Sequence, residues 1–203
     1  LALVACLPRN RLNDVFLHYF DHSVQFREDA DYTLDHLTGL YHLQYMLKAP
    51  DEGGVAEPAF LHEVDAFTRW LRAQPEVRHV ASFSDTMQRL NRNMHGDDPA
   101  FQRLPESREL AAQYLLLYEM SLPYGLDLNN QVSVDKSALR LNVAIRTLSS
   151  AQAIAFNARA EGWVAANAPA VQSVEGTGAI LMFSHIGERN SRSMLRCSSP
   201  PSS

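Results

Sequence analysis

The residues best suited to metal chemistry in this sequence of 203 residues are two of its eight histidines. His18 and His22 lie four residues apart, and on a helix this spacing brings two imidazoles to one side, where they could share a metal ion. The glutamate of the zinc-protease motif does not follow His18, and no third ligand is obvious nearby in the sequence. We therefore interpret both as solvent-facing histidines and predict no metal site.

Motifs for nucleophilic catalysis and for phosphate or dinucleotide binding are missing. The sequence has no Gly-x-Ser-x-Gly elbow and no phosphate-cradling glycine loop. Gly176-Thr177-Gly178 precedes an apolar run, but it is too short for a dinucleotide fingerprint and better fits an irregular strand. No catalytic residues and no cofactor are predicted, so the expectation is a protein that is not an enzyme. A small hydrolase that uses the scattered histidines is the least favoured hypothesis.

The strongest candidate for ligand contact is an apolar helix that is predicted to open at Pro105 and to end at Pro123. It is apolar nearly all round, which predicts burial on several sides. Aromatic and methionine side chains provide adaptable apolar contacts, so one stripe could line a path for an apolar substrate. The alternative is that the same stripe belongs to the core. The candidate path residues are Tyr114, Leu117, Tyr118 and Met120.

Composition limits the possible classes of protein and partner. An apolar content of 46% in 203 residues is enough to bury a core. The net charge is −5 and the charges are spread along the chain without a basic block, which argues against a nucleic-acid partner. No run reaches the roughly 18–20 apolar residues that span a bilayer. Cys6 and Cys197 lie at opposite ends of the chain and do not indicate a disulfide framework.

The first half of the sequence predicts a strand, a helix and a second strand. Residues 39–47 alternate between apolar and polar, as in a half-buried strand. A helix is expected between Pro58 and Pro75 because Phe60, Val64, Phe67 and Leu71 follow at helical spacing. Residues 77–83 form the second strand of this βαβ unit. The preceding segments are predicted as a short amphipathic helix, or a collar segment near a membrane, at 13–26 and a polar turn at 26–31.

The second half repeats this order after two connecting helices. The first connecting helix is predicted at 85–94 with Ser84 as its cap. The following segments are a strand pair at 129–134 and 138–147 and a helix that begins with the capping-box pair Ser149 and Gln152 and ends near Asn167. A final strand at 171–183 is broken by Gly176 and Gly178. The predicted class is therefore α+β, with two tandem βαβ units in ferredoxin-like halves and additional helices between them.

Three long strings resemble a known family: RLNRNMHGDD at 89–98, LPESRELAAQYLLLYEMSLPYGLDLNN at 104–130 and GERNSRSML at 187–195. They are similar to the extracytoplasmic, porter-like loop between the first and second transmembrane helices of bacterial exporters of the resistance-nodulation-division (RND) superfamily. The branch is that of the hydrophobe exporters and the mycobacterial large membrane proteins (MMPL-like). The resemblance covers roughly residues 10–195. It implies porter subdomains built from βαβ units.

This resemblance also implies a function and a location. The chain would be the periplasmic portion of a proton-driven exporter in a bacterial inner membrane, binding or guiding apolar or lipid-like substrate without being transport-competent alone. Its partners would be a hydrophobic small molecule, the rest of the transporter with its second extracytoplasmic loop, and further copies in a homo-oligomer. The proton-coupling carboxylates of such exporters lie in membrane helices that are not in this sequence.

The resemblance divides the chain into six segments. They are a truncated transmembrane end or linker (1–12), a first porter-like βαβ unit (13–83), connecting helices (84–126), a second porter-like βαβ unit (127–185), a lead-in to a membrane helix (186–196) and a disordered tail (197–203). The alternative function is a free-standing periplasmic lipoprotein or adaptor that binds envelope partners, because Leu3-Val4-Ala5-Cys6 loosely fits a lipoprotein processing site.

Overall fold

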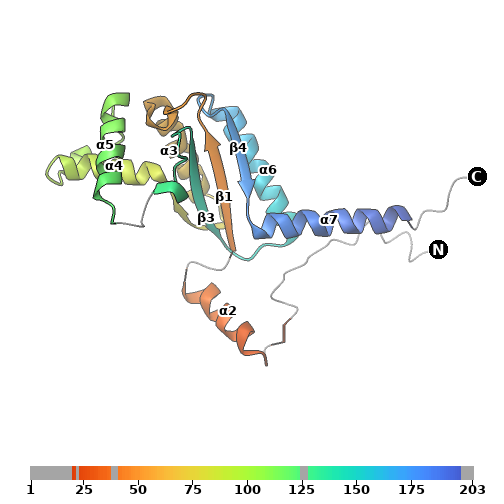
Figure 1. Cartoon of the computed structure of the whole chain (residues 1–203). Helices are drawn as coiled ribbons and strands as arrows, with labels where there is room; N and C mark the ends of the chain where they lie inside the picture. Colours follow the sequence, from red (N-terminus) through yellow and green to blue (C-terminus); the bar gives the residue numbers. More distant parts are fainter. Residues whose placement is uncertain (1–19, 22, 38–40, 124–127, 198–203) are drawn as a thin grey trace, which may run out of the picture.

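Four strands form one antiparallel sheet, with two long helices packed against one of its faces (Figure 1). This computed structural model describes residues 20, 21, 23–37, 41–123 and 128–197. The strands are β1 (Tyr41–Lys48), β2 (Val77–Ala81), β3 (Ala138–Ile145) and β4 (Ser173–Thr177). The α-helices are α2 (Gln25–His36), α3 (Pro58–Arg72), α4 (Phe83–Met94), α5 (Arg108–Ser121), α6 (Ser150–Asn167) and α7 (Ala179–Cys197). Short 3-10 helices are η3 (Gly54–Ala56), η4 (Pro99–Phe101) and η5 (Leu128–Asn130).

The strand order is β2-β3-β1-β4, and every neighbouring pair is antiparallel. Strands β1 and β2, which α3 connects, are therefore parallel to each other but separated by β3. In the same way, α6 connects β3 and β4 across β1. In each βαβ unit, one strand of the other unit therefore lies between the unit's own two strands. This is a split βαβ arrangement. The predicted α+β class is confirmed, whereas two separate ferredoxin-like halves are not, because the two units share one sheet.

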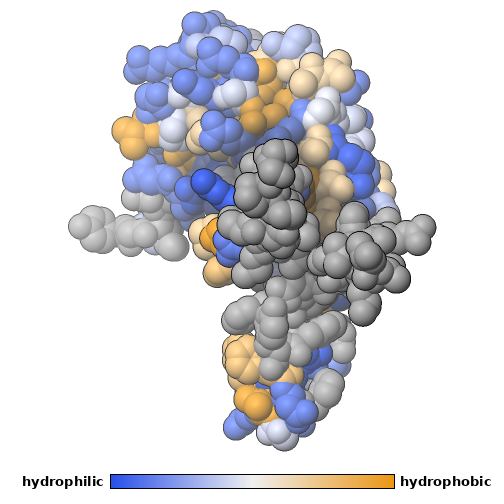
Figure 2. All heavy atoms as spheres, turned by 90° about the vertical axis from the view of Figure 1, so that its right-hand side faces the viewer, coloured by the Kyte–Doolittle hydropathy of each residue, from blue (hydrophilic) through white to orange (hydrophobic). Residues whose placement is uncertain are grey.

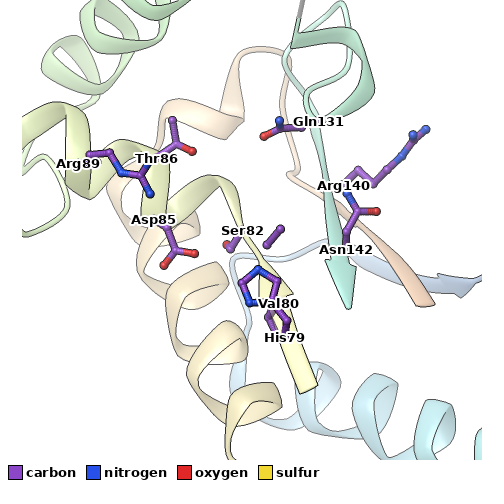
Figure 3. Close-up of a pocket in the computed structure, with 10 residues that line it drawn as sticks. His79, Val80, Ser82, Asp85, Thr86, Arg89, Gln131, Arg140 and Asn142 are labelled. Atoms are coloured by element: carbon purple, nitrogen blue, oxygen red, sulfur yellow. The ribbon is translucent and has the colours of Figure 1, made fainter. Parts of the chain in front are cut away.

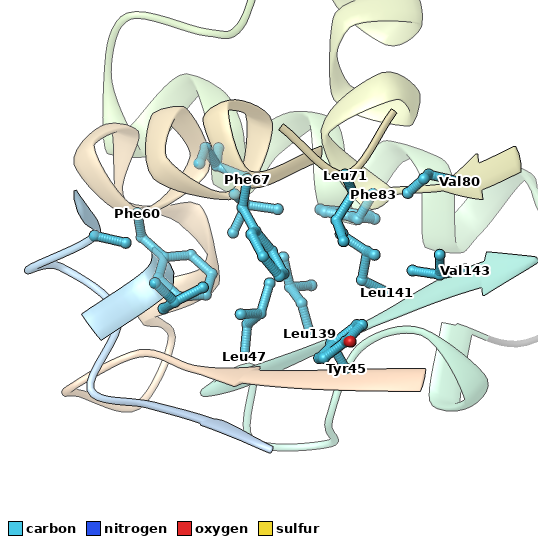
Figure 4. Packing of buried hydrophobic residues seen from close by; sticks show 14 of the residues in the cluster. Tyr45, Leu47, Phe60, Phe67, Leu71, Val80, Phe83, Leu139, Leu141 and Val143 are labelled. Carbon is cyan, nitrogen blue, oxygen red and sulfur yellow. The ribbon is translucent and has the colours of Figure 1, made fainter. Parts of the chain in front are cut away.

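The core lies between this sheet and helices α3 and α6. On β1, Leu43, Tyr45 and Leu47 are fully buried, while the alternate residues are exposed or half-buried. This alternation is the period of a strand with one covered face. Figure 4 shows Tyr45 and Leu47 directed toward Phe67 of α3, and the Tyr45 and Phe67 rings meet edge to face at 5.6 Å. Strand β1 therefore contributes the central residues of the sheet side of the core.

A cluster of three aromatic rings joins the two covering helices. Trp163 of α6 stacks on Phe67 and Trp70 of α3, with centroid separations of 5.6 and 5.7 Å. The ring planes lie within 25° of each other, and aromatic pairs of this kind add stability beyond their buried area. The cluster fixes α3 and α6 side by side over the sheet. The opposite face of the sheet carries polar residues, and in Figure 1 it turns toward the viewer with α3 and α6 behind it.

Most predicted elements are confirmed in place, with small shifts at their ends. The Ser149–Gln152 capping box is present in full: the side chain of each residue accepts from the backbone N–H of the other. Helix α4 begins two residues earlier than predicted, because Ser82 and not Ser84 is its cap. Helix α5 begins at Arg108, where Ser107 accepts a hydrogen bond from the N–H of Leu110. Hydroxyl caps therefore determine where these helices begin.

The predicted turn at 26–31 is wrong, because these residues belong to α2. Arg27 and Asp31 form an ion pair at 2.7 Å with the i,i+4 spacing that supports a helix. Ala30 and Leu34 form a small buried cluster against Tyr41. The predicted helix at 13–26 lies mostly outside the described residues.

One predicted strand is also wrong, and another is shorter than predicted. Residues 129–134 contain η5 and a single bridge from Val132 to Leu139, because the chain folds back at once into the turn before β3. The strand predicted at 171–183 ends at Thr177. Gly178 has φ = 146°, and a Cβ there would lie 2.6 Å from the carbonyl oxygen of His42, so this glycine ends the strand before α7 begins. Within the described ranges, none of the helices combines the length and the apolar character needed to cross a bilayer.

The turn before β3 is held by the carboxylate of Asp135. Its Oδ1 accepts from the Ser133 hydroxyl at 2.6 Å, and its Oδ2 accepts from the Ser137 hydroxyl at 2.7 Å. These hydrogen bonds, together with that from the Ser137 N–H, lower the pKa of Asp135 from 3.8 to about 2. The backbone carbonyl of Asp135 also accepts from the N–H of Gly53, so the same turn holds the loop before η3.

We expect Asp135→Asn to lower the stability of the fold at pH 7 in a pH-dependent way. A depressed pKa in the folded state contributes stability above the ordinary value of 3.8, and this contribution disappears as the pH falls through about 2. Urea unfolding midpoints measured between pH 7 and pH 2 should show the difference between wild type and variant shrinking below pH 4. A difference that stays constant over this range would contradict the role of the carboxylate.

Candidate functional site

Helix α5 contains the predicted path residues and is anchored to α4 by a buried polar contact. The Tyr114 hydroxyl donates to Oδ1 of Asn91 at 3.0 Å, and the Asn91 amide donates to the carbonyl oxygen of Arg103 at 3.0 Å. Both side chains are buried, and burial raises the pKa of Tyr114. Because an unpaired polar group costs free energy in the interior, this network favours one orientation of α5 on α4.

Ion pairs connect both ends of α5 to the β1–α3 loop and to the turn before β3. Arg108 pairs with Glu57 at 2.7 Å near the start of the helix, and Glu119 pairs with Lys136 at 2.9 Å near its end. All four side chains are at least partly exposed, so each pair contributes little stability. They act together with the buried Tyr114 contact to fix which side of the helix faces the core.

The four predicted path residues lie on two different sides of α5. Tyr114 is buried in the core and Tyr118 is half-buried against it. Leu117 and Met120 point outward, with 42% and 77% of their surface exposed. The structure therefore brings Tyr114 and Tyr118 together, and separates them from Leu117 and Met120.

The exposed side of α5 carries a third large apolar residue, Leu116, which is 54% exposed. We call Leu116, Leu117 and Met120 the outer apolar face of α5. Only Ala111, Tyr114 and Leu115 of this helix are buried. The predicted burial of α5 on several sides is therefore wrong for the described part of the chain. The helix is apolar all round because one apolar side packs in the core and a second apolar side faces solvent.

Further exposed apolar side chains occur on other elements, α2 and α7 among them. Val24 and Phe26 lie at the start of α2, and Met182, Phe183 and Ile186 lie in the first turns of α7. Figure 2 views the molecule from the side of α7 and shows apolar residues of α2 at its lower end. These side chains are apart from the outer apolar face of α5, so the apolar surface is divided among separate elements.

A polar pocket that no sequence motif predicts lies between the sheet and α4 (Figure 3). It has a volume of ≈ 250 Å³. Its lining comes from β2 and α4 in one stretch of the sequence, residues 79–89, and from the residue after η5 and β3 in a second stretch, residues 131–142. The residues that line it are His79, Val80, Ala81, Ser82, Asp85, Thr86, Arg89, Gln131, Arg140 and Asn142. None of these residues stands in a recognisable motif, so only the fold brings them together.

Among the described residues, no group of three or more His, Cys, Asp or Glu side chains is placed to hold a metal ion. His18 and His22, the pair with metal-ligand spacing, lie outside the described residues.

No protein-family model matches the sequence, and no curated protein matches it.

Two tyrosines in the core allow the anchor of α5 to be tested. Tyr114→Phe removes the hydroxyl that satisfies Asn91, and we expect it to lower the free energy of unfolding by about 1–3 kcal/mol. The matched control is Tyr45→Phe, because the buried Tyr45 hydroxyl has no hydrogen-bond partner among the described residues. Its removal should leave stability unchanged or raise it. Urea unfolding measures both variants, and an equal loss in the two would contradict the anchoring role.

Proposed function

We propose that this chain is the periplasmic, porter-like portion of a proton-driven RND-superfamily exporter, and that it binds or guides apolar or lipid-like substrate. The outer apolar face of α5 is the observation that carries this proposal, because it presents Leu116, Leu117 and Met120 to solvent. Two other features support it. The three sequence strings resemble the corresponding loop of such exporters, and the α+β sheet with its interleaved βαβ units is compatible with a porter subdomain.

The physical basis is the removal of apolar surface from water. Complete burial of a leucine or methionine side chain stabilises by about 1.5–3 kcal/mol. Leu116, Leu117 and Met120 are each partly exposed, so covering all three would contribute free energy of this order. A flexible acyl chain or another apolar molecule lying across α5 would cover them. Since Met is flexible and polarizable, the surface suits a class of apolar molecules more than one shape.

In this proposal the fragment is a binding element and does not transport by itself. The proton-driven step belongs to the membrane part of the exporter. This chain would work together with the second extracytoplasmic loop of the exporter and with further copies of the exporter in a homo-oligomer. Relative motion of such packed subdomains is hinge or shear movement.

The alternative proposal is a periplasmic adaptor or lipoprotein domain that binds envelope proteins. The same outer apolar face favours this alternative, because exposed apolar patches also mark protein contacts. The two functions differ in the occupant of the face: a small apolar molecule in the first and the surface of another protein in the second.

We expect the double variant Leu117→Asp/Met120→Asp to lose affinity for an uncharged fluorescent lipid analogue, a pyrene-labelled fatty alcohol. Two carboxylates on the outer apolar face oppose contact with an apolar chain, so binding measured by fluorescence titration should weaken by at least about tenfold. The fold should persist, because both wild-type side chains are exposed and contribute little to the core.

The control is Val134→Asp, which places a carboxylate at an apolar residue with 86% exposure in the turn before β3. Its affinity should stay within about twofold of wild type. Equal affinity of wild type and double variant would overturn the proposed contact surface. Failure of the wild-type chain to bind the analogue would favour the adaptor function.

A further inference from the structure

The pocket between β2, β3 and α4 has a lining rich in hydrogen-bond donors and positive charge. Arg89 of α4 and Arg140 of β3 contribute two guanidinium groups, and Gln131 and Asn142 contribute amides. The hydroxyl of Thr86 also lines it (Figure 3). No hydrogen bond or ion pair of these five side chains occurs with any described residue. Their donors are therefore available to a ligand.

The pocket also contains one carboxylate, that of Asp85. Arg72 of α3 pairs with both of its oxygens: Nη1 donates to Oδ1 at 3.1 Å and Nη2 donates to Oδ2 at 2.6 Å. A bidentate pair of this kind compensates the negative charge of Asp85. Arg89 and Arg140 are then the uncompensated charges of the pocket, in a chain whose net charge is −5. This concentration of positive charge contrasts with the acidic character of the whole chain.

The side chains of Arg89 and Arg140 are free to change rotamer around the pocket. Figure 3 shows Arg89 reaching over the start of α4 near Thr86 and Asp85, whereas the guanidinium of Arg140 points away from α4. Both residues are exposed, so a rotamer change of Arg140 meets no packed core. The N-terminal turn of α4 also lines the pocket, and its partial positive charge adds to the field of the arginines.

The size and chemistry of the lining select the ligand class. A volume of ≈ 250 Å³ lies below the 300–1,000 Å³ typical of pockets for drug-sized molecules. Arginine forks together with amide and hydroxyl donors match an oxyanion that has several acceptor oxygens. A phosphate group meets both conditions, since it is small, charged and rich in acceptors.

We infer that this pocket binds a phosphomonoester or phosphodiester group, with Arg89 and Arg140 as the charged contacts. This inference is independent of the proposed apolar contact on α5, because the two sites share no residue. Two sources offer the same chemistry: a free phosphate compound and the headgroup of an anionic phospholipid. The neutral lining residues Thr86, Gln131 and Asn142 would hydrogen-bond to the phosphate oxygens.

The experiment measures binding by the full chain of two probes, glycerol 3-phosphate in solution and vesicles of phosphatidylglycerol with phosphatidylcholine. Calorimetry detects the first and co-sedimentation the second, with pure phosphatidylcholine vesicles as the neutral reference. We expect wild type to bind at least one anionic probe, and Arg89→Gln/Arg140→Gln to weaken that binding by at least about tenfold. Binding of glycerol 3-phosphate indicates a free phosphate compound as the source. Binding of the anionic vesicles alone indicates a headgroup.

The matched control is Arg146→Gln/Arg189→Gln, which removes the same charge from exposed arginines outside the pocket. Its affinity should remain within about twofold of wild type. A second variant, Asp85→Asn, removes the carboxylate partner of Arg72 and so adds one net positive charge beside the pocket. It should tighten binding, a gain that misfolding does not produce. Equal weakening by both arginine pairs, or no binding of either probe up to about 10 mM phosphate, would overturn the inference.

Discussion

The double pairing of strand β1 is the constraint on which the rest of the structure depends. This strand forms ladders with β3 on one side and β4 on the other, while its alternate side chains enter the core. A shift of one residue would carry Leu43, Tyr45 and Leu47 to the polar face and break both ladders at once. The aromatic contact between Tyr45 and Phe67 ties this register to α3. The position of α3 then orients Trp163, and with it α6, over the sheet.

Helix α4 connects the framework to both candidate surfaces. Asn91 on one side of α4 holds Tyr114, which orients α5 and turns Leu117 and Met120 outward. Asp85 and Arg89 of the same helix line the polar pocket beside β2 and β3. A change in the position of α4 would therefore affect both surfaces. They are also chemically different, since one offers apolar contact and the other offers charge and hydrogen-bond donors.

Local patterns in the sequence predict local structure well here. The spacing of Phe60, Val64, Phe67 and Leu71 predicted α3 because all four side chains enter the core. The Ser149–Gln152 pair predicted the start of α6, because both capping hydrogen bonds involve only neighbouring residues. The apolar run after Gly178 is predicted as part of a strand but belongs to α7, since a run of this length is apolar in either a strand or a helix end. Its helical state depends on contacts with α6 and β1, which are not encoded locally.

The strand order, the pocket and the buried side of α5 could not be predicted from the sequence, because they depend on contacts between residues far apart in the chain. The strand order requires pairing of residues about 100 positions apart, and periodicity within a strand carries no information about its partner. The same argument applies to the pocket, where Arg89, Gln131 and Arg140 become neighbours only after β3 is inserted between β1 and β2. For α5, apolar residues around the helix concealed which side is buried. The contact of Tyr114 with Asn91 decides this, and Asn91 lies on another helix.

The interleaved sheet also determines when this protein is able to fold during its synthesis. Tyr41 pairs with Ile145 and Leu47 with Leu139, so the first strand remains without a partner until more than 90 further residues have been made. At about 5–20 residues per second this interval lasts roughly 5–20 seconds. During this time the apolar residues of β1 and α3 are exposed on the nascent chain and available to form aggregates. Production of the protein therefore depends on protection of its first half, by a chaperone or by low concentration, until β3 is complete.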